Sequence, residues 1–131
     1  MSYLGIRERR LGAISILDAD AEVRIALKFG GRVITLSKAV ESLLDDGRDQ
    51  ILVNLEQVPS IGSPGLTELV SASVVTNRKG GRFKLVHLNE AVLEIMKQAQ
   101  LLTCFEVFDV EARAIDSFTA SLSKASSGNI S

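Results

Sequence analysis

An apolar strand that leads through a short loop into a proline-opened helix is the feature that most constrains the fold of this chain. The run 51–55 carries four large apolar side chains in five residues, which is typical of a strand buried on both faces. After the loop, Pro64 suits the first helical position, where a missing N–H costs nothing, and it pushes the preceding residue toward the extended conformation of a cap. The sequence therefore predicts that Ser63 is the N-cap of a helix and that its hydroxyl lies at the helix N-terminus.

Length and composition indicate a single domain. The chain has 131 residues, of which 46% are hydrophobic, enough to bury one core and too few for two ordinary domains. Residues 123–131 are mostly small and polar, which is typical of a segment that packs against nothing. We therefore expect one domain over residues 1–122 and a flexible C-terminal tail over residues 123–131.

Charge and cysteine usage narrow the class of function. Fifteen basic and sixteen acidic residues leave a net charge of −1, so bulk charge favours neither direct nucleic acid binding nor adsorption on an anionic membrane. The single cysteine, Cys104, excludes an intramolecular disulfide and is typical of a reducing compartment. No apolar run approaches the roughly 18 residues of a membrane span, and the N-terminus lacks a signal-peptide core. We expect a cytoplasmic protein without membrane insertion.

Strand and helix patterns alternate from Thr35 onward, which favours a sheet with parallel central strands covered by helices. Thr35 and Asn89 are predicted helix caps. The strands are expected at 3–9, 13–17, 51–55, 82–88 and 104–108, with a further strand-like alternation at 23–27. The helices are expected from 36 to 45–47, from 64 to 77–81, from 90 to about 100, and from 110 to 122. The core side of the 64–81 helix is expected to carry Leu66, Leu69, Val70, Ser73 and Val74.

No recognised catalytic, metal or nucleotide motif occurs in the sequence. His87 has no second histidine, cysteine or carboxylate at ligand spacing, so we expect a hydrogen-bonded strand histidine and no metal site. Cys104 lies in an apolar setting, where a small core residue is expected, and no base can be assigned to activate Ser63. The glycine pairs 30–31 and 80–81 match neither GxGxxG nor a Walker loop and are interpreted as chain reversals. We therefore expect no enzymatic activity and no cofactor.

Three segments together resemble the STAS domain of anti-sigma factor antagonists. The first is the strand 51–58 followed by Ile61-Gly-Ser-Pro-Gly-Leu-Thr-Glu-Leu-Val70 at the start of a helix. The others are Gly80-Gly-Arg-Phe-Lys-Leu-Val86 and Leu101-Leu-Thr-Cys-Phe-Glu-Val-Phe-Asp109, which resemble the family's next strand and the approach to its final strand. The resemblance extends roughly from Leu11 to Phe118.

The resemblance implies a fold and a function. The implied fold is of the α/β class, with a mixed sheet of four to five strands, a parallel centre, a first strand antiparallel at an edge, and about four helices mainly on one side. The family's members are cytoplasmic bacterial regulators of transcription that switch partners. The unmodified antagonist binds an anti-sigma factor, which is a serine kinase, and phosphorylation ends the binding. By position the phosphoacceptor is Ser63, and the partner-binding residues are Ile61, Gly62, Ser63, Pro64, Gly65, Leu66, Thr67 and Glu68.

Two residues depart from the family pattern. Gly62 stands where an acidic residue normally precedes the serine, and Pro64 removes one N–H from those that a phosphate could receive, leaving the amides of Gly65 and Leu66. Glu56 and Glu68 are candidates to supply the missing negative charge.

Alternatives therefore stay open. Ser63 could be a helix cap only, and the chain could be a phosphorylation-independent adaptor or scaffold. It could also be a small-molecule or nucleotide-binding STAS module, with a pocket beyond the carboxyl ends of the strands. The oligomeric state, a homodimer included, is not determined by the sequence.

Overall fold

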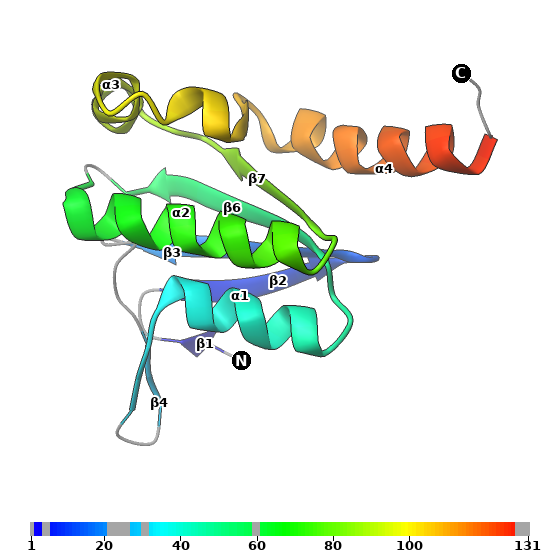
Figure 1. The fold of residues 1–131 in the computed structure, drawn as a ribbon, viewed down its shortest axis with the longest axis horizontal. Coiled ribbons are helices and arrows are strands. Elements are labelled where there is room, and N and C mark those ends of the chain that lie inside the picture. Colours follow the sequence, from blue (N-terminus) through cyan, green and yellow to red (C-terminus); the bar gives the residue numbers. More distant parts are fainter. Residues whose placement is uncertain (1, 4–5, 21–26, 30–31, 59–60, 128–131) are drawn as a thin grey trace.

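The chain folds around a mixed β-sheet. The computed structural model describes residues 2–3, 6–20, 27–29, 32–58 and 61–127. The strand order in the sheet is β1-β2-β3-β6-β7-β8 (Figure 1). The strands are β1 (Ser2–Tyr3), β2 (Ile6–Leu11), β3 (Ile14–Asp20), β6 (Gln50–Gln57), β7 (Arg82–Val86) and β8 (Glu106–Phe108). A separate antiparallel pair is formed by β4 (Leu27–Phe29) and β5 (Arg32–Ile34).

Helices follow the strands in an alternating order within the described chain. They are α1 (Leu36–Asp45), α2 (Ser63–Arg78), α3 (Glu90–Gln98), the short 3-10 turn η1 (Leu102–Cys104) and α4 (Glu111–Ser127). The predicted caps are confirmed, because the side chain of Thr35 accepts a hydrogen bond from the amide of Lys38 and that of Asn89 accepts one from Val92. Both side chains thereby satisfy an amide that the helix leaves without a partner.

The strand directions confirm the expected fold class. β3, β6, β7 and β8 run parallel to one another, and β2 pairs with β3 antiparallel. The predicted N-terminal hairpin is thus present, with Gly12 at a φ of 59° in its turn. The two-residue β1 is one strand more than the four or five that were expected.

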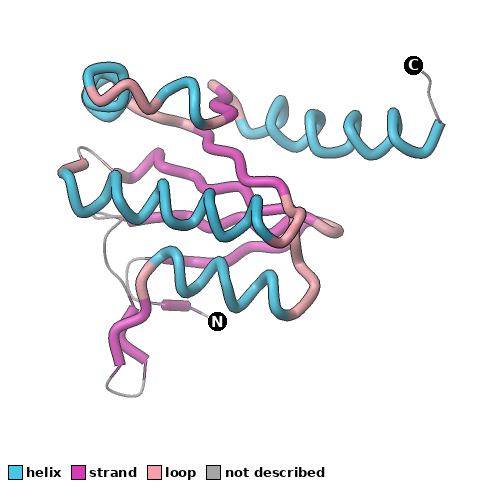
Figure 2. Tube along the Cα trace, in the orientation of Figure 1, coloured by secondary structure: helices cyan, strands magenta, loops and turns pink. Residues whose placement is uncertain are grey.

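The two faces of the sheet pack against different helices. Alternate residues of β6 divide between them: Ile51 and Val53 belong to the larger core cluster under α1, α2 and α3, whereas Leu52 packs with residues of α4. Figure 2 shows α1 and α2 side by side on one face of the strands, with α4 apart from them. The expectation of helices mainly on one side therefore holds for α1 to α3, and α4 covers the other face.

The α4 face buries a lysine. Lys84 is 1% exposed, and its Nζ donates a hydrogen bond of 2.6 Å to Ser117 Oγ. The same ammonium lies 3.3 Å from a carboxylate oxygen of Glu106 and 4.5 Å from the ring centroid of Phe118. Since a buried charge is tolerated only with partners of this kind, Lys84 ties α4 to β7 and β8.

Two expected core residues are wrong. Val74 is 42% exposed, because the buried side of α2 runs through Leu69, Ala72 and Thr76 instead. Thr76 is tolerated there since its hydroxyl donates to the carbonyl of Ala72 at 2.7 Å. Cys104 is exposed at the end of η1. The neighbouring Phe105 fills the core in its place, where its ring lies 6.2 Å from that of Phe83.

The ends of two elements also differ from expectation. β7 ends at Val86, so His87 lies just beyond the strand, with a φ of 61°. α4 continues to Ser127 and not to Leu122, because the sequence contains no glycine or proline after the helix starts until Gly128. Most of the strand-like segment 23–27 and the glycines at 30–31 lie outside the described residues.

Candidate functional site

Helix α2 begins one residue earlier than the sequence predicts. Gly62 is its N-cap, with an extended φ of −102° and no side-chain cap bond, and Ser63 is the first helical residue. The first helical hydrogen bond runs from the amide of Leu66 to the carbonyl of Gly62 at 3.0 Å. The prediction of Ser63 as the cap is therefore wrong. Ile61 and Gly65 are both buried, and this packing on either side of Ser63 overrides the local preference of a residue before proline.

Val58 and Ile61, which precede α2, are both buried in the core. Val58 is fully buried, its amide donates to the carbonyl of Leu55 at 3.0 Å, and its own carbonyl accepts from Asn89 Nδ2 at 2.7 Å. The side-chain oxygen of Asn89, Oδ1, accepts from the amide of Val92 and so caps α3. Ile61, 6% exposed, anchors the far end of the loop in the core. The end of β6 and the start of α3 thus fix the approach to α2.

Exposure divides the eight expected partner-binding residues. Gly62, Ser63 and Thr67 are exposed, and Leu66 and Glu68 are half-buried. Ile61 and Gly65 are buried, which removes them from the surface that a partner could touch. The side chain of Pro64 is not among those described. The accessible surface at the start of α2 is therefore small and centres on the Ser63 hydroxyl.

The amides at the start of α2 offer little to an anion. The amide of Leu66 already donates to Gly62, contrary to the expectation that it stays available, and Pro64 has no N–H. The amides of Ser63 and Gly65 are the first-turn donors that remain, and Gly65 is buried. A negative group on Ser63 would gain from the positive end of the helix dipole more than from direct hydrogen bonds.

Glu68 is engaged inside the fold. Its Oε1 accepts hydrogen bonds from both the amide and the hydroxyl of Ser37, each at 3.0 Å. Ser37 lies in the first turn of α1, so the carboxylate of Glu68 complements that helix terminus. Glu56 is exposed and lies 3.8 Å from His87 Nδ1. The carboxylate of Glu68 is therefore held by two hydrogen bonds within the fold, whereas among the described residues that of Glu56 has only this longer contact.

A polar network that the sequence did not reveal lies on the α4 face, at the carboxyl end of β3. Arg9 donates to Asp18 at 2.6 Å and to Glu111 of α4 at 2.8 Å. Asn54 Nδ2 donates to Asp18 at 2.9 Å, so its Oδ1 faces His87 Nδ1 at 3.0 Å and that nitrogen carries the proton. The expectation of a hydrogen-bonded histidine is confirmed.

These hydrogen bonds, first that of Asp18 and then that of Glu111, raise the pKa of Arg9. The network joins β2, β3 and β6 to α4, which is a structural role. The signal that could have revealed it is the pair Asp18 and Asn54, two polar residues that each stand between apolar neighbours in a strand.

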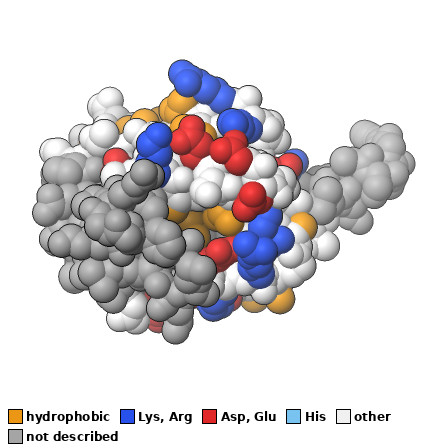
Figure 3. Space-filling view, turned by 90° about the horizontal axis from the view of Figure 1, so that it is seen from below, with side chains coloured by type: hydrophobic (Ala, Val, Ile, Leu, Met, Phe, Trp, Pro, Cys, Tyr) orange, Lys and Arg blue, Asp and Glu red, His pale blue; other side chains and the backbone are white. Residues whose placement is uncertain are grey.

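Figure 3 shows one side of the molecule, on which basic and acidic side chains alternate over the described surface. Among the described residues, Lys79 and Asp45 form one such pair of opposite charges, 2.9 Å apart. Across the described chain, no three histidine, cysteine or acidic side chains converge as metal ligands do. None of the helices described there has both the length and the apolar character required to cross a bilayer.

Comparison with known proteins identifies related sequences and folds. A family model described as the STAS domain matches residues 23–114. A candidate anti-sigma factor antagonist from Thermotoga maritima shares 21% identity, covering 86% of this chain and 92% of that chain, with a TM-score of 0.69. An anti-sigma factor antagonist from Mycobacterium paratuberculosis shares 17% identity over 86% of this chain and 91% of that chain, with a TM-score of 0.68.

A third solved structure is the anti-sigma factor antagonist SpoIIAA in its unphosphorylated form. It shares 14% identity over 87% of this chain and 97% of that chain, with a TM-score of 0.63. A search of curated proteins returns no significant match. At identities this low, the three structures show a common fold.

Proposed function

Because the chain belongs to the STAS domain family, we propose that it is an anti-sigma factor antagonist-like module that binds an anti-sigma factor with serine kinase activity. The observation that carries the proposal is Ser63, exposed at the first residue of α2, where the family carries its phosphoacceptor. As such a module it acts without catalysis of its own, by binding a protein partner in the bacterial cytoplasm and thereby regulating transcription.

The docking surface is the start of α2 and the side of that helix that stays accessible. Gly62, Ser63 and Thr67 are exposed and Leu66 is half-buried. Gly62 has no side chain, so a partner can approach the backbone at the cap more closely than an aspartate would allow. The apolar part of Leu66 and the hydroxyls of Ser63 and Thr67 then form the contact.

Phosphorylation of Ser63 provides the switch. A phosphoserine carries about −1.5 to −2 charges at neutral pH, at a surface with few amides to receive it. Within the free chain the helix dipole accommodates the charge. Against a partner that approaches Gly62 closely, the phosphate adds bulk and a charge to be desolvated, and each ~1.4 kcal/mol lost weakens binding tenfold. Phosphorylation therefore ends binding without any rearrangement of the fold.

A second candidate keeps the fold and the partner surface but dispenses with phosphorylation. Gly62 and Pro64 favour this adaptor or scaffold role, since they remove a side-chain charge and an amide from beside the hydroxyl. The two candidates differ in one respect only, which is whether charge at Ser63 changes the affinity for the partner.

An anti-sigma kinase from the same genome tests the switch. After incubation with that kinase and ATP, intact-mass analysis should show one added phosphate on the chain and none on Ser63→Ala. Ser63→Glu should bind the kinase at least about tenfold more weakly than the unmodified chain. Ser42→Glu, which adds the same charge at an exposed position of α1, is the matched control and should bind normally.

The binding and mass measurements distinguish the switch from the adaptor role. If the kinase binds wild type and Ser63→Glu equally and adds no phosphate, the switch is rejected and the adaptor role stands. If the kinase does not bind the unmodified chain at all, the proposed partner is wrong.

A further inference from the structure

A cavity at the other end of α2 has polar walls that partner binding at Ser63 does not use. Its volume is about 520 Å³, and it lies between the last turns of α2, the start of β7 and the segment from η1 to β8. This is the amino end of β7, opposite to the carboxyl ends where a ligand pocket was expected. The volume is within the range of roughly 300–1,000 Å³ found for small-molecule sites.

Several polar side chains that line this cavity have unused hydrogen-bonding capacity. Within the described chain, Ser73, Asn77, Arg82 and Thr103 have no hydrogen bond or ion pair from their side chains. Other arginines are engaged, for example Arg48, whose guanidinium donates to Ser15 Oγ at 2.6 Å. The residues that line this hollow therefore carry two hydroxyls, one carboxamide and one guanidinium whose hydrogen-bonding groups only water satisfies.

The balance of charge in the cavity is positive. The one carboxylate in its wall, that of Glu106, lies 3.3 Å from the buried ammonium of Lys84 and is offset by it. Arg82 has no such counter-charge among the residues that the structure describes. A guanidinium with free N–H groups matches the planar, bidentate geometry of a carboxylate or phosphate. The cavity is therefore suited to a ligand with an oxyanion group.

The backbone around the cavity is fixed before any ligand arrives. Gly80 has a φ of 76°, and a Cβ on Gly81 would lie 2.6 Å from the carbonyl oxygen of Asp49. The amide of Gly81 donates to Thr76 at 2.9 Å and that of Arg82 to Asp49 at 2.8 Å. Binding would then order few groups, which lowers its entropic cost.

We propose that this cavity binds a small polar molecule through a carboxylate or phosphate held by Arg82, with Ser73, Asn77 and Thr103 hydrogen-bonded to the rest of the ligand. The site is independent of partner docking, because the length of α2 separates it from Ser63 by about 20 Å. The proposal does not rest on the function of Ser63 and can fail or hold on its own.

Amide chemical shifts measured during titration test the site directly. The probes are inorganic phosphate, citrate and adenosine monophosphate, which separate a bare phosphate, a carboxylate and a phosphate on a larger polar body. At least one should give saturable shifts at the amides of Gly80, Gly81 and Thr103. The same probe should slow the reaction of Cys104, the cavity's exposed thiol, with a thiol reagent.

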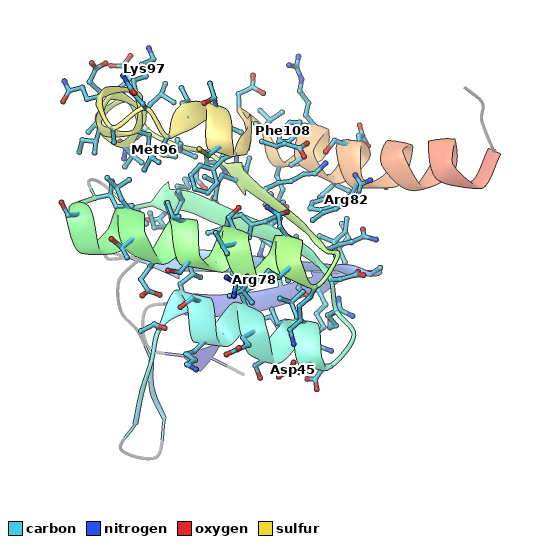
Figure 4. The ribbon with its side chains drawn as sticks, viewed as in Figure 1. Asp45, Arg78, Arg82, Met96, Lys97 and Phe108 are labelled. Carbon is cyan, nitrogen blue, oxygen red and sulfur yellow. The ribbon has the colours of Figure 1, made fainter. Side chains whose placement is uncertain are left out.

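Two arginine variants show whether the binding is specific. Arg82→Ala should weaken binding at least about tenfold, the usual consequence of losing a charged hydrogen-bond pair. Arg78→Ala is the matched control, since it removes the same charge at the same end of α2 from a residue that does not line the cavity. Figure 4 shows Arg82 on the α4 side of α2 and Arg78 on the side toward α1.

Two results would overturn the proposal. One is that none of the three probes gives saturable shifts at the cavity amides. The other is that Arg78→Ala and Arg82→Ala weaken binding equally, because the probe would then respond to net charge and not to a site. Asn77→Ala gives a second check that does not alter charge, and it should also weaken binding.

Discussion

Replacing Asn89 should loosen the loop that presents Ser63. The side chain has two roles, since Oδ1 caps α3 through the amide of Val92 at 2.9 Å and Nδ2 donates to the carbonyl of Val58 at 2.7 Å. Asn89→Ala removes the cap, at about 1 kcal/mol. It also leaves the carbonyl of fully buried Val58 without this donor, at about 1–3 kcal/mol. The expected loss of unfolding free energy is about 2–4 kcal/mol.

Urea unfolding measures this loss. With a slope of about 2 kcal/mol per molar for a chain of this size, the midpoint should fall by about 1–2 M. Asn89→Ser is the matched control, because serine caps nearly as well as asparagine but is too short to reach Val58. It should lose only the share due to Val58, and its amides near Ser63 should exchange faster than those of α1. If Asn89→Ala and Asn89→Ser both lie within about 0.5 kcal/mol of wild type, the carbonyl of Val58 does not depend on Asn89.

Three further predictions concern groups away from Ser63. Lys84→Ala should cost about 3 kcal/mol through lost packing and the cavity that it leaves, whereas Lys84→Met, of similar volume, should cost less than about 1.5 kcal/mol; equal losses in urea unfolding would contradict this. Arg9→Met should cost about 1 kcal/mol, less at high salt, because its side chain is 39% exposed. Asp18 and Glu111 raise the pKa of Arg9. The contribution of Arg9 to the free energy of unfolding is therefore present below the ordinary arginine pKa and should not fall as pH rises toward that value. Cys104 should react with a thiol reagent at the same rate in folded and unfolded protein, and a strongly protected thiol would refute its exposure.

The architecture could be predicted because its signals are local and agree with one another. The run 51–55 carries four large apolar side chains, and all five of its residues are buried between the two layers. Thr35 begins α1 and Gly47, with a φ of 83°, follows its end. In such segments, periodicity, capping and turn chemistry indicate the same boundaries, and tertiary packing has nothing to override.

The details of the site could not be predicted, because they depend on contacts between distant segments. The local preference of a residue before proline predicts Ser63 as a cap, yet the burial of Ile61 and Gly65 shifts the start of α2 by one residue. Glu68 was a candidate for partner contact until Ser37, thirty-one residues earlier, proved to be its hydrogen-bond donor. Cys104 lies in an apolar stretch of sequence, but the turn η1 directs Phe105 into the core instead.

The same contacts bear on how a switch at Ser63 could work. Glu68 ties the first part of α2 to the start of α1, and Asn89 ties the loop before α2 to the start of α3. The start of α2 and the segment before it are therefore tied to the starts of α1 and α3, and Ile61 and Gly65, on either side of Ser63 in the sequence, are buried. A charge added at Ser63 meets a framework with little freedom to rearrange, so its effect must fall on the partner interface. Ser63→Glu should consequently leave amide exchange in α2 unchanged while it weakens partner binding, and faster exchange throughout α2 would show that the switch acts by loosening the helix.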